Sequence, residues 1–133
     1  MKKVVFLCSA RANSKPENDH LNETLADKIE KLDFGCIYAA RDTDQTQPAN
    51  IVHATNKSHI KNSEIFVAVL KNYSKNLAGE VGYAHARKEL GQNPRVILGL
   101  DFGETNPDDL MMIQSFDKII KPEELEAELK KYA

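Results

Sequence analysis

One glutamate stands in surroundings that favour covalent chemistry. Glu80 lies between Gly79 and Gly82, shortly after an apolar run and a polar loop. Small residues let a substrate approach a carboxylate closely, and the positive end of a helix favours the ionised form of an acid in its opening turn. An ionised, positioned carboxylate can attack an anomeric carbon. A plainer interpretation also stays open, because an acid in a first turn complements the helix dipole.

A second polar residue interrupts an apolar helix face. Asn56 lies four residues from both Val52 and Ile60, which predicts that its amide faces the same way as these apolar side chains. A polar group in that position needs a partner or a ligand. A hydrogen bond to nearby backbone would satisfy it equally well, so a binding role and a structural role are both open.

Several other kinds of site lack support in the pattern. His53, His59 and His85 form no metal-binding motif, and the serines form no Gly-x-Ser-x-Gly elbow. The loop 9–15 contains hydroxyls, an amide and two cations but no glycine, unlike dinucleotide-binding and phosphate-binding loops. Its side chains could hold a phosphate, or it could be an ordinary polar surface loop. We expect no metal and no organic cofactor.

The elements that must position these residues follow from apolar patterning. Three short runs are apolar without alternation, as in strands that are covered on both faces: Val4–Cys8, Ile65–Leu70 and Val96–Leu100. Shorter strands are predicted at 36–40 and 118–120. Helical periodicity predicts the remaining elements: a helix capped by Asp19 and stopped by Gly35, one from Pro48 through Ile60, one ending near Gly91, one opening at Asn106-Pro107, and one opening at Lys121-Pro122.

Strands and helices therefore alternate along the chain. Alternation implies right-handed crossovers and a parallel sheet, which predicts an α/β fold: a single flavodoxin-like doubly wound domain over residues 1–133, with about five strands and helices on both faces. Ligands of such folds bind outside the carboxyl ends of the strands. The chemistry is thus expected in four segments: 9–19, 41–47, 71–82 and 101–109.

Composition narrows the class of partner. Eighteen Lys and Arg against twenty Asp and Glu leave a net charge of -2 without a basic block, so we expect no nucleic-acid partner. No apolar stretch approaches the ~20 residues that span a bilayer, so we expect no membrane partner either. Only two cysteines, Cys8 and Cys36, are present, which favours buried thiols and a cytoplasmic location.

The segment around Glu80 also resembles a known family. The buried strand Ile65–Leu70 and the run Ala78-Gly79-Glu80-Val81-Gly82-Tyr83-Ala84-His85-Ala86 are similar to nucleoside 2-deoxyribosyltransferases, including the related deoxynucleoside 5'-monophosphate N-glycosidases. The similarity extends from the N-terminal strand to about Gly103 and more loosely through 109–113. The resemblance implies cleavage of an N-glycosidic bond by double displacement, with transfer to another base or to water.

The resemblance also implies roles for individual residues. Glu80 would be the catalytic nucleophile, and the substrate-binding residues would be Ser9, Arg11, Asn56, Ser74, Gly79, Tyr83 and Asp109. Asn56 and Ser74 stand where transferases often have aspartate, and Phe6 stands where a tyrosine is common. Ser74 and Arg11 favour a nucleotide, whereas a carboxylate at Asp109 favours a free 5'-hydroxyl.

Two functional interpretations follow. The first is an enzyme acting on a small nucleoside or nucleotide, as a homodimer or larger assembly with the segment 109–113 near the partner's site. The apolar Met111, Met112 and Ile113 in that segment fit burial between subunits. The alternative is a catalytically inactive nucleotide-binding or sensing module on the same fold, which fits the replacement of both accessory aspartates.

Overall fold

The strands form one parallel sheet. In the computed structural model, which describes residues 2–9 and 16–133, the strand order is β2-β1-β3-β4-β5. All four neighbouring pairs are parallel. The strands are β1 (Val4–Cys8), β2 (Gly35–Ile37), β3 (Ile65–Leu70), β4 (Val96–Asp101) and β5 (Lys118–Ile120). This arrangement confirms the predicted α/β class and the doubly wound order.

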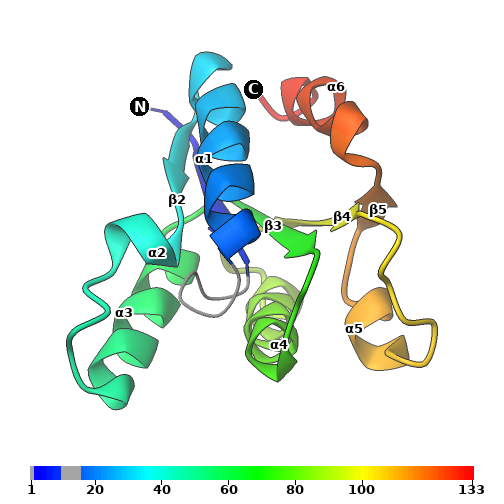
Figure 1. The fold of residues 1–133 in the computed structure, drawn as a ribbon. Coiled ribbons are helices and arrows are strands. Elements are labelled where there is room, and N and C mark those ends of the chain that lie inside the picture. The colour runs from blue at the N-terminus through cyan, green and yellow to red at the C-terminus, as the bar shows by residue number, and fades with distance from the viewer. Residues whose placement is uncertain (1, 10–15) are drawn as a thin grey trace.

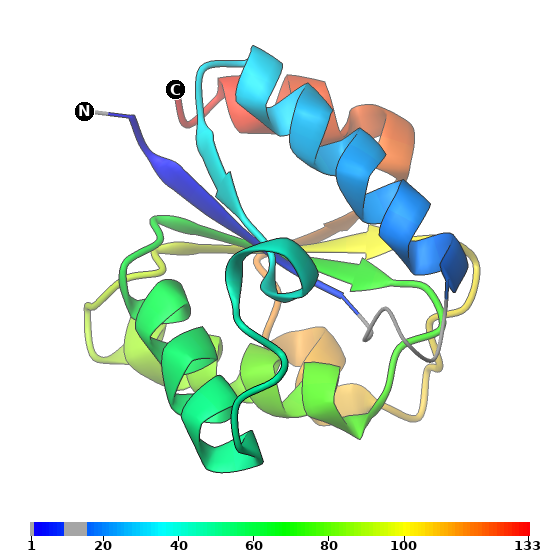
Figure 2. The ribbon, with the colours of Figure 1, turned by 60° about the vertical axis from the view of Figure 1, so that its left-hand side comes forward.

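Helices cover both faces of the sheet. Figures 1 and 2 show α1 (Pro16–Lys31) and α6 (Leu125–Lys130) on one face, and α3 (Ala49–Lys61), α4 (Lys75–Glu89) and α5 (Leu110–Gln114) on the other. A short helix, α2 (Ala39–Asp42), follows β2, and a 3-10 turn, Pro122–Glu124, precedes α6. Among the described residues, no helix combines the length and apolar character needed to cross a membrane.

The apolar core is divided by the sheet into two layers. Along β1, Val5 and Leu7 belong to the layer under α1 and α6, whereas Phe6 and Cys8 belong to the layer over α3 and α4. This alternation is the two-residue period of a strand whose faces are both covered. Every residue of β3 is buried. Cys8 therefore faces the layer that contains α4 and Glu80.

Three element boundaries differ from the sequence-based prediction. Helix α1 begins at Pro16 rather than after Asp19, since proline suits the first helical position. Residues 39–42 form α2 instead of extending the strand, because the Asp42 carboxylate accepts a hydrogen bond from the Tyr38 amide at 3.0 Å and closes a turn. The Asn106 side chain accepts from the amide of Asp108, which makes a turn and delays α5 to Leu110.

Candidate active site

The carboxyl edge of the sheet contains a switch point between β1 and β3. These neighbouring strands end at the same edge, and the helices that follow them lie on opposite faces of the sheet: α1 follows β1 and α4 follows β3 (Figure 2). Doubly wound folds bind their ligands at such a switch point. The candidate site is therefore built at the ends of β1 and β3.

A buried asparagine ties the two strand ends together. The Asn18 side chain of α1 donates to the Ser9 hydroxyl at 3.2 Å and to the Lys71 carbonyl oxygen at 2.9 Å. It also accepts from the Asn72 side-chain nitrogen at 3.2 Å. Ser9, a predicted site residue, thus lies at the switch point, and its hydroxyl accepts a hydrogen bond from α1. Arg11, another predicted site residue, lies outside the described residues.

Glu80 occupies the second turn of α4. The helix begins at Lys75 and has no acid in its first turn, so the expectation of an opening-turn glutamate was wrong by one turn. The carboxylate lies against the end of β1, where the Cys8 thiol donates a hydrogen bond to Glu80 Oε2 with Sγ and Oε2 3.9 Å apart. Strand β1 and helix α4 together position the candidate nucleophile.

Burial sets the charge of this carboxylate. Desolvation raises the pKa of Glu80 to about 7, and the hydrogen bond from Cys8 opposes this only in part. The expectation that the helix end would favour the ionised form is therefore corrected, because a carboxylate in the second turn gains less from the dipole than it loses in hydration. Burial and the neighbouring Glu80 raise the pKa of Cys8, so its thiol stays protonated and remains a donor at neutral pH.

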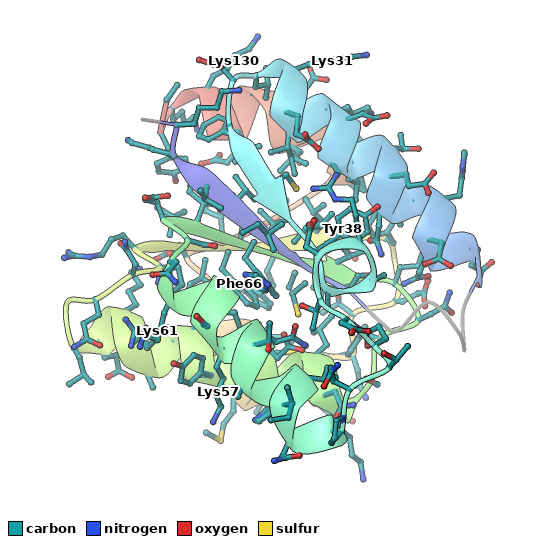
Figure 3. The ribbon with its side chains drawn as sticks, turned by 90° about the vertical axis from the view of Figure 1, so that its left-hand side faces the viewer. Lys31, Tyr38, Lys57, Lys61, Phe66 and Lys130 are labelled. Carbon is teal, nitrogen blue, oxygen red and sulfur yellow. The ribbon has the colours of Figure 1, made fainter. Side chains whose placement is uncertain are left out.

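Glu80 lies on the flank of α4 that faces α3. The Lys57 ammonium of α3 lies over the ring of Tyr83, 5.4 Å from its centroid, which brings the two helices together at that level. Figure 3 labels Lys57 on α3, which lies beside α4. Arg87 approaches the same ring at 6.0 Å. Because Glu80 precedes Tyr83 by three residues, both side chains lie on one flank. Tyr83 thus contacts α3 and packs against the core about one turn beyond Glu80.

Asn56 finds a partner that the sequence did not indicate. It lies on α3 between the buried residues Val52 and Ile60, as its spacing predicted. Its carbonyl oxygen accepts a hydrogen bond of 2.8 Å from the hydroxyl of Thr43, a residue only 6% exposed at the end of α2. The partner is thus a side chain from another carboxyl-edge loop and not nearby backbone.

Ser74 and Asp109 lie together in a separate groove. This groove of about 650 Å³ runs between the start of α4 and α5. Tyr73 donates to the Asp109 carboxylate at 2.9 Å and accepts from the amide of Asn106 at 3.1 Å. Ala78 lines the groove and precedes Glu80 by two residues, about 200° around the helix. The groove and Glu80 therefore lie on different flanks of α4.

The glycines beside Glu80 are open to their surroundings. Gly79 and Gly82 are exposed, and a methyl group at either position would meet nothing within 4 Å. Neither residue is required by close packing within the described part of the chain. The predicted role of Gly79, room for a ligand beside the carboxylate, stays a prediction.

Two contacts of the site escaped the sequence-based interpretation. Cys8 was expected only as a buried thiol, and Thr43 was not singled out. The sequence indicates these two residues only by their position, because both lie at or after the end of a strand, near the carboxyl edge of the sheet. Among the described residues, no group of three or more His, Cys, Asp or Glu side chains is arranged to hold a metal ion.

Comparisons with known proteins establish a likeness of fold. A conserved protein from Enterococcus faecalis V583 matches with a TM-score of 0.73 and 16% identity over 100% of both chains. A 2-deoxyribosyltransferase from Leishmania mexicana matches with a TM-score of 0.59 and 16% identity, over 74% of this chain and 63% of that chain. No protein-family model and no curated protein matches the sequence. At these identities the shared property is the α/β fold with its five-stranded parallel sheet.

Proposed function

We propose that this protein cleaves the N-glycosidic bond of 2'-deoxynucleosides or their 5'-monophosphates, with Glu80 as the nucleophile. The observation that carries the proposal is a desolvated carboxylate held by Cys8 at the switch point of the sheet. Desolvated, positioned carboxylates with shifted pKa values are typical of catalytic groups. The likeness of fold to a 2-deoxyribosyltransferase supports the same reaction class.

The chemistry is a double displacement at C1'. An ionised Glu80 oxygen attacks C1' while the bond from C1' to the base nitrogen breaks, and the base leaves with that electron pair and takes up a proton. Water or a second base then attacks C1' of the glycosyl ester, loses a proton and releases the carboxylate. Two inversions give overall retention. Atoms and charges balance without a cofactor, so none is part of the proposal.

The remaining predicted residues would surround the sugar and its 5' end. Asn56 on α3 and Ser9 after β1 are the candidates for the site of Glu80, and Arg11 belongs to the loop after β1. Ser74 and Asp109 line the groove on the other flank of α4. We propose that this second flank serves the site of a neighbouring subunit in a homodimer or larger assembly.

The exposed apolar residues beside that groove support an assembly. Met111 is 90% exposed and Leu110 is 62% exposed, although both are apolar. Burial of such side chains between subunits is favourable. We place the assembly in the cytoplasm, since Cys8 and Cys36 are both free thiols.

Chromatography of reaction mixtures tests the proposal. Wild type and E80Q are incubated with the four common deoxynucleosides and their monophosphates, with and without adenine as acceptor. Free base without exchange indicates a hydrolase, and an exchanged nucleoside indicates a transferase. Both activities should be lost in E80Q. Wild type that binds these compounds but releases no base at any enzyme concentration would favour a binding or sensing module.

A further inference from the structure

The hydrogen bond between Thr43 and Asn56 uses one particular half of the amide. The Thr43 hydroxyl donates to Asn56 Oδ1 at 2.8 Å. Thr43 is itself fixed, because it is buried and its backbone amide donates to the Ala39 carbonyl oxygen at 3.0 Å. The hydroxyl is therefore a stationary donor, and the orientation of the Asn56 amide is set by it.

An Asn56 amide oriented in this way can offer only hydrogen-bond donors to a bound ligand. Asn has one carbonyl acceptor and one NH₂ group with two donors. With Oδ1 turned toward Thr43, the NH₂ group points away from Thr43. Nδ2 donates no hydrogen bond to any residue in 2–9 or 16–133. Asn56 is partly exposed, so these N–H donors are open to a ligand that supplies an acceptor.

The position of Asn56 brings this donor close to the candidate nucleophile. Lys57, the next residue on α3, lies over the Tyr83 ring of α4. Asn56 stands about 10 Å from the start of α3 and Glu80 about 7 Å from the start of α4, at 1.5 Å per residue. Helix α3 follows β2 and helix α4 follows β3 in the parallel sheet, so both run back from its carboxyl edge. Asn56 is one residue from Lys57 and Glu80 is three residues from Tyr83, so both lie within one helical turn of this contact between α3 and α4.

We propose that Thr43 determines specificity by fixing Asn56 as a hydrogen-bond donor toward the ligand. The part of the ligand bound beside Glu80 then carries an acceptor, such as a carbonyl oxygen, ring nitrogen or hydroxyl oxygen, in preference to an N–H group. This inference rests on the proposed function and adds a positioning residue to it. A site built to donate discriminates strongly against groups that cannot accept.

Ligand binding to a variant that cannot turn over tests the inference. In the E80Q background, the probes are the four deoxynucleosides, their monophosphates and the free bases, and the readouts are affinity by calorimetry and the side-chain NH₂ signals of Asn56 by NMR. We expect the tightest probe to shift those signals. T43V should weaken its binding about 3-fold to 10-fold, and N56D, which replaces the donor by an acceptor, at least about 10-fold.

Matched variants separate orientation from simple packing. T43S keeps the hydroxyl and should restore most of the affinity lost in T43V. T55V removes a hydroxyl from α3, the helix that carries Asn56. This hydroxyl donates only to the Ile51 carbonyl oxygen, so the variant should bind like the parent. A T43V penalty that persists with a free base places the acceptor on the base, whereas a penalty confined to sugar-bearing probes places it on the sugar.

Different results would overturn this inference and the proposed function. The inference is overturned if no probe shifts the Asn56 NH₂ signals, or if T43V and N56D bind as tightly as the parent. Turnover is read separately, as base release by the protein with Glu80 intact. If no base is released but a probe shifts the Asn56 NH₂ signals and T43V binds it more weakly, the proposed enzyme activity is refuted. The role of Thr43 in orienting Asn56 is then retained.

Discussion

At the scale of single residues, the charge of Glu80 controls the proposed reaction. A nucleophilic carboxylate must be ionised, and burial raises the pKa of Glu80 to about 7. We expect kcat/KM to fall about tenfold for each pH unit below this value and to level off above it. The measurement is base release between about pH 5 and pH 9. If kcat/KM is already independent of pH from pH 5 upward, the claim that burial raises the pKa of the nucleophile Glu80 is refuted.

The same carboxylate links stability to pH. Its pKa is about 7 in the folded state against an ordinary value of 4.5, so folding favours the protonated acid. The resulting stabilisation is complete below pH 4.5 and is lost as the pH rises through 7. Relative to E80Q, the wild type should lose up to about 3 kcal/mol across this window. Urea unfolding at several pH values measures this; parallel curves for the two proteins would count against it.

The Cys8 thiol moderates this shift. Its hydrogen bond favours the ionised form of Glu80, so C8A should raise the pKa of Glu80 above about 7, and C8S, which keeps a donor, should not. Titration of the Glu80 side-chain carbon by NMR measures the effect without any need for turnover. Identical titration midpoints of Glu80 in C8A and wild type would show that the thiol does not affect the pKa of Glu80.

At the scale of elements, α4 contains two glycines that weaken it. A methyl group added at Gly79 or Gly82 would stand in open space, so alanine should fit at both positions. Each change should stabilise the protein by about 0.5–1 kcal/mol through helix propensity. If the space beside Glu80 admits the ligand, G79A lowers ligand affinity while G82A, the matched control, does not. Thermal unfolding and ligand titration of both variants provide the test.

The elements could largely be predicted from sequence, and the reason lies in burial. Strands β1, β3 and β4 are covered on both faces, so their continuous apolar runs are unambiguous. Helix starts were less predictable, because side-chain contacts decide them. The turn at Asp42 and the turn at Asn106 each include a side-chain hydrogen bond that no periodicity reveals.

At the scale of the whole molecule, a face is left with exposed apolar residues. Met111 and Leu110, on α5, are the candidates for an interface between copies. M111D should shift the protein from an assembly to a monomer, since a carboxylate would be buried without a partner. L90D changes another apolar residue, one that is 75% exposed at the end of α4, and should leave the assembly intact. Light scattering measures the oligomeric state of each protein. A monomeric wild type at micromolar concentration would refute the proposed interface.

The arrangement of the candidate site was only partly predictable. The carboxyl-edge rule identified the segments that carry Ser9, Ser74 and Glu80, because topology alone fixes that edge. It could not show that Ser74 and Glu80 lie on different flanks of α4, nor that Cys8 contacts Glu80. Such pairings depend on side-chain directions between elements distant in sequence.

A covalent bond between Glu80 and the sugar is the central step of the proposed reaction, and mass spectrometry tests it most directly. Wild type and E80Q are mixed with a deoxynucleoside or monophosphate that releases base, quenched in acid and digested. We expect a deoxyribosyl adduct on the peptide that contains Glu80 in wild type and none in E80Q. Base release by wild type with no adduct at Glu80, together with undiminished turnover by E80Q, would contradict this mechanism.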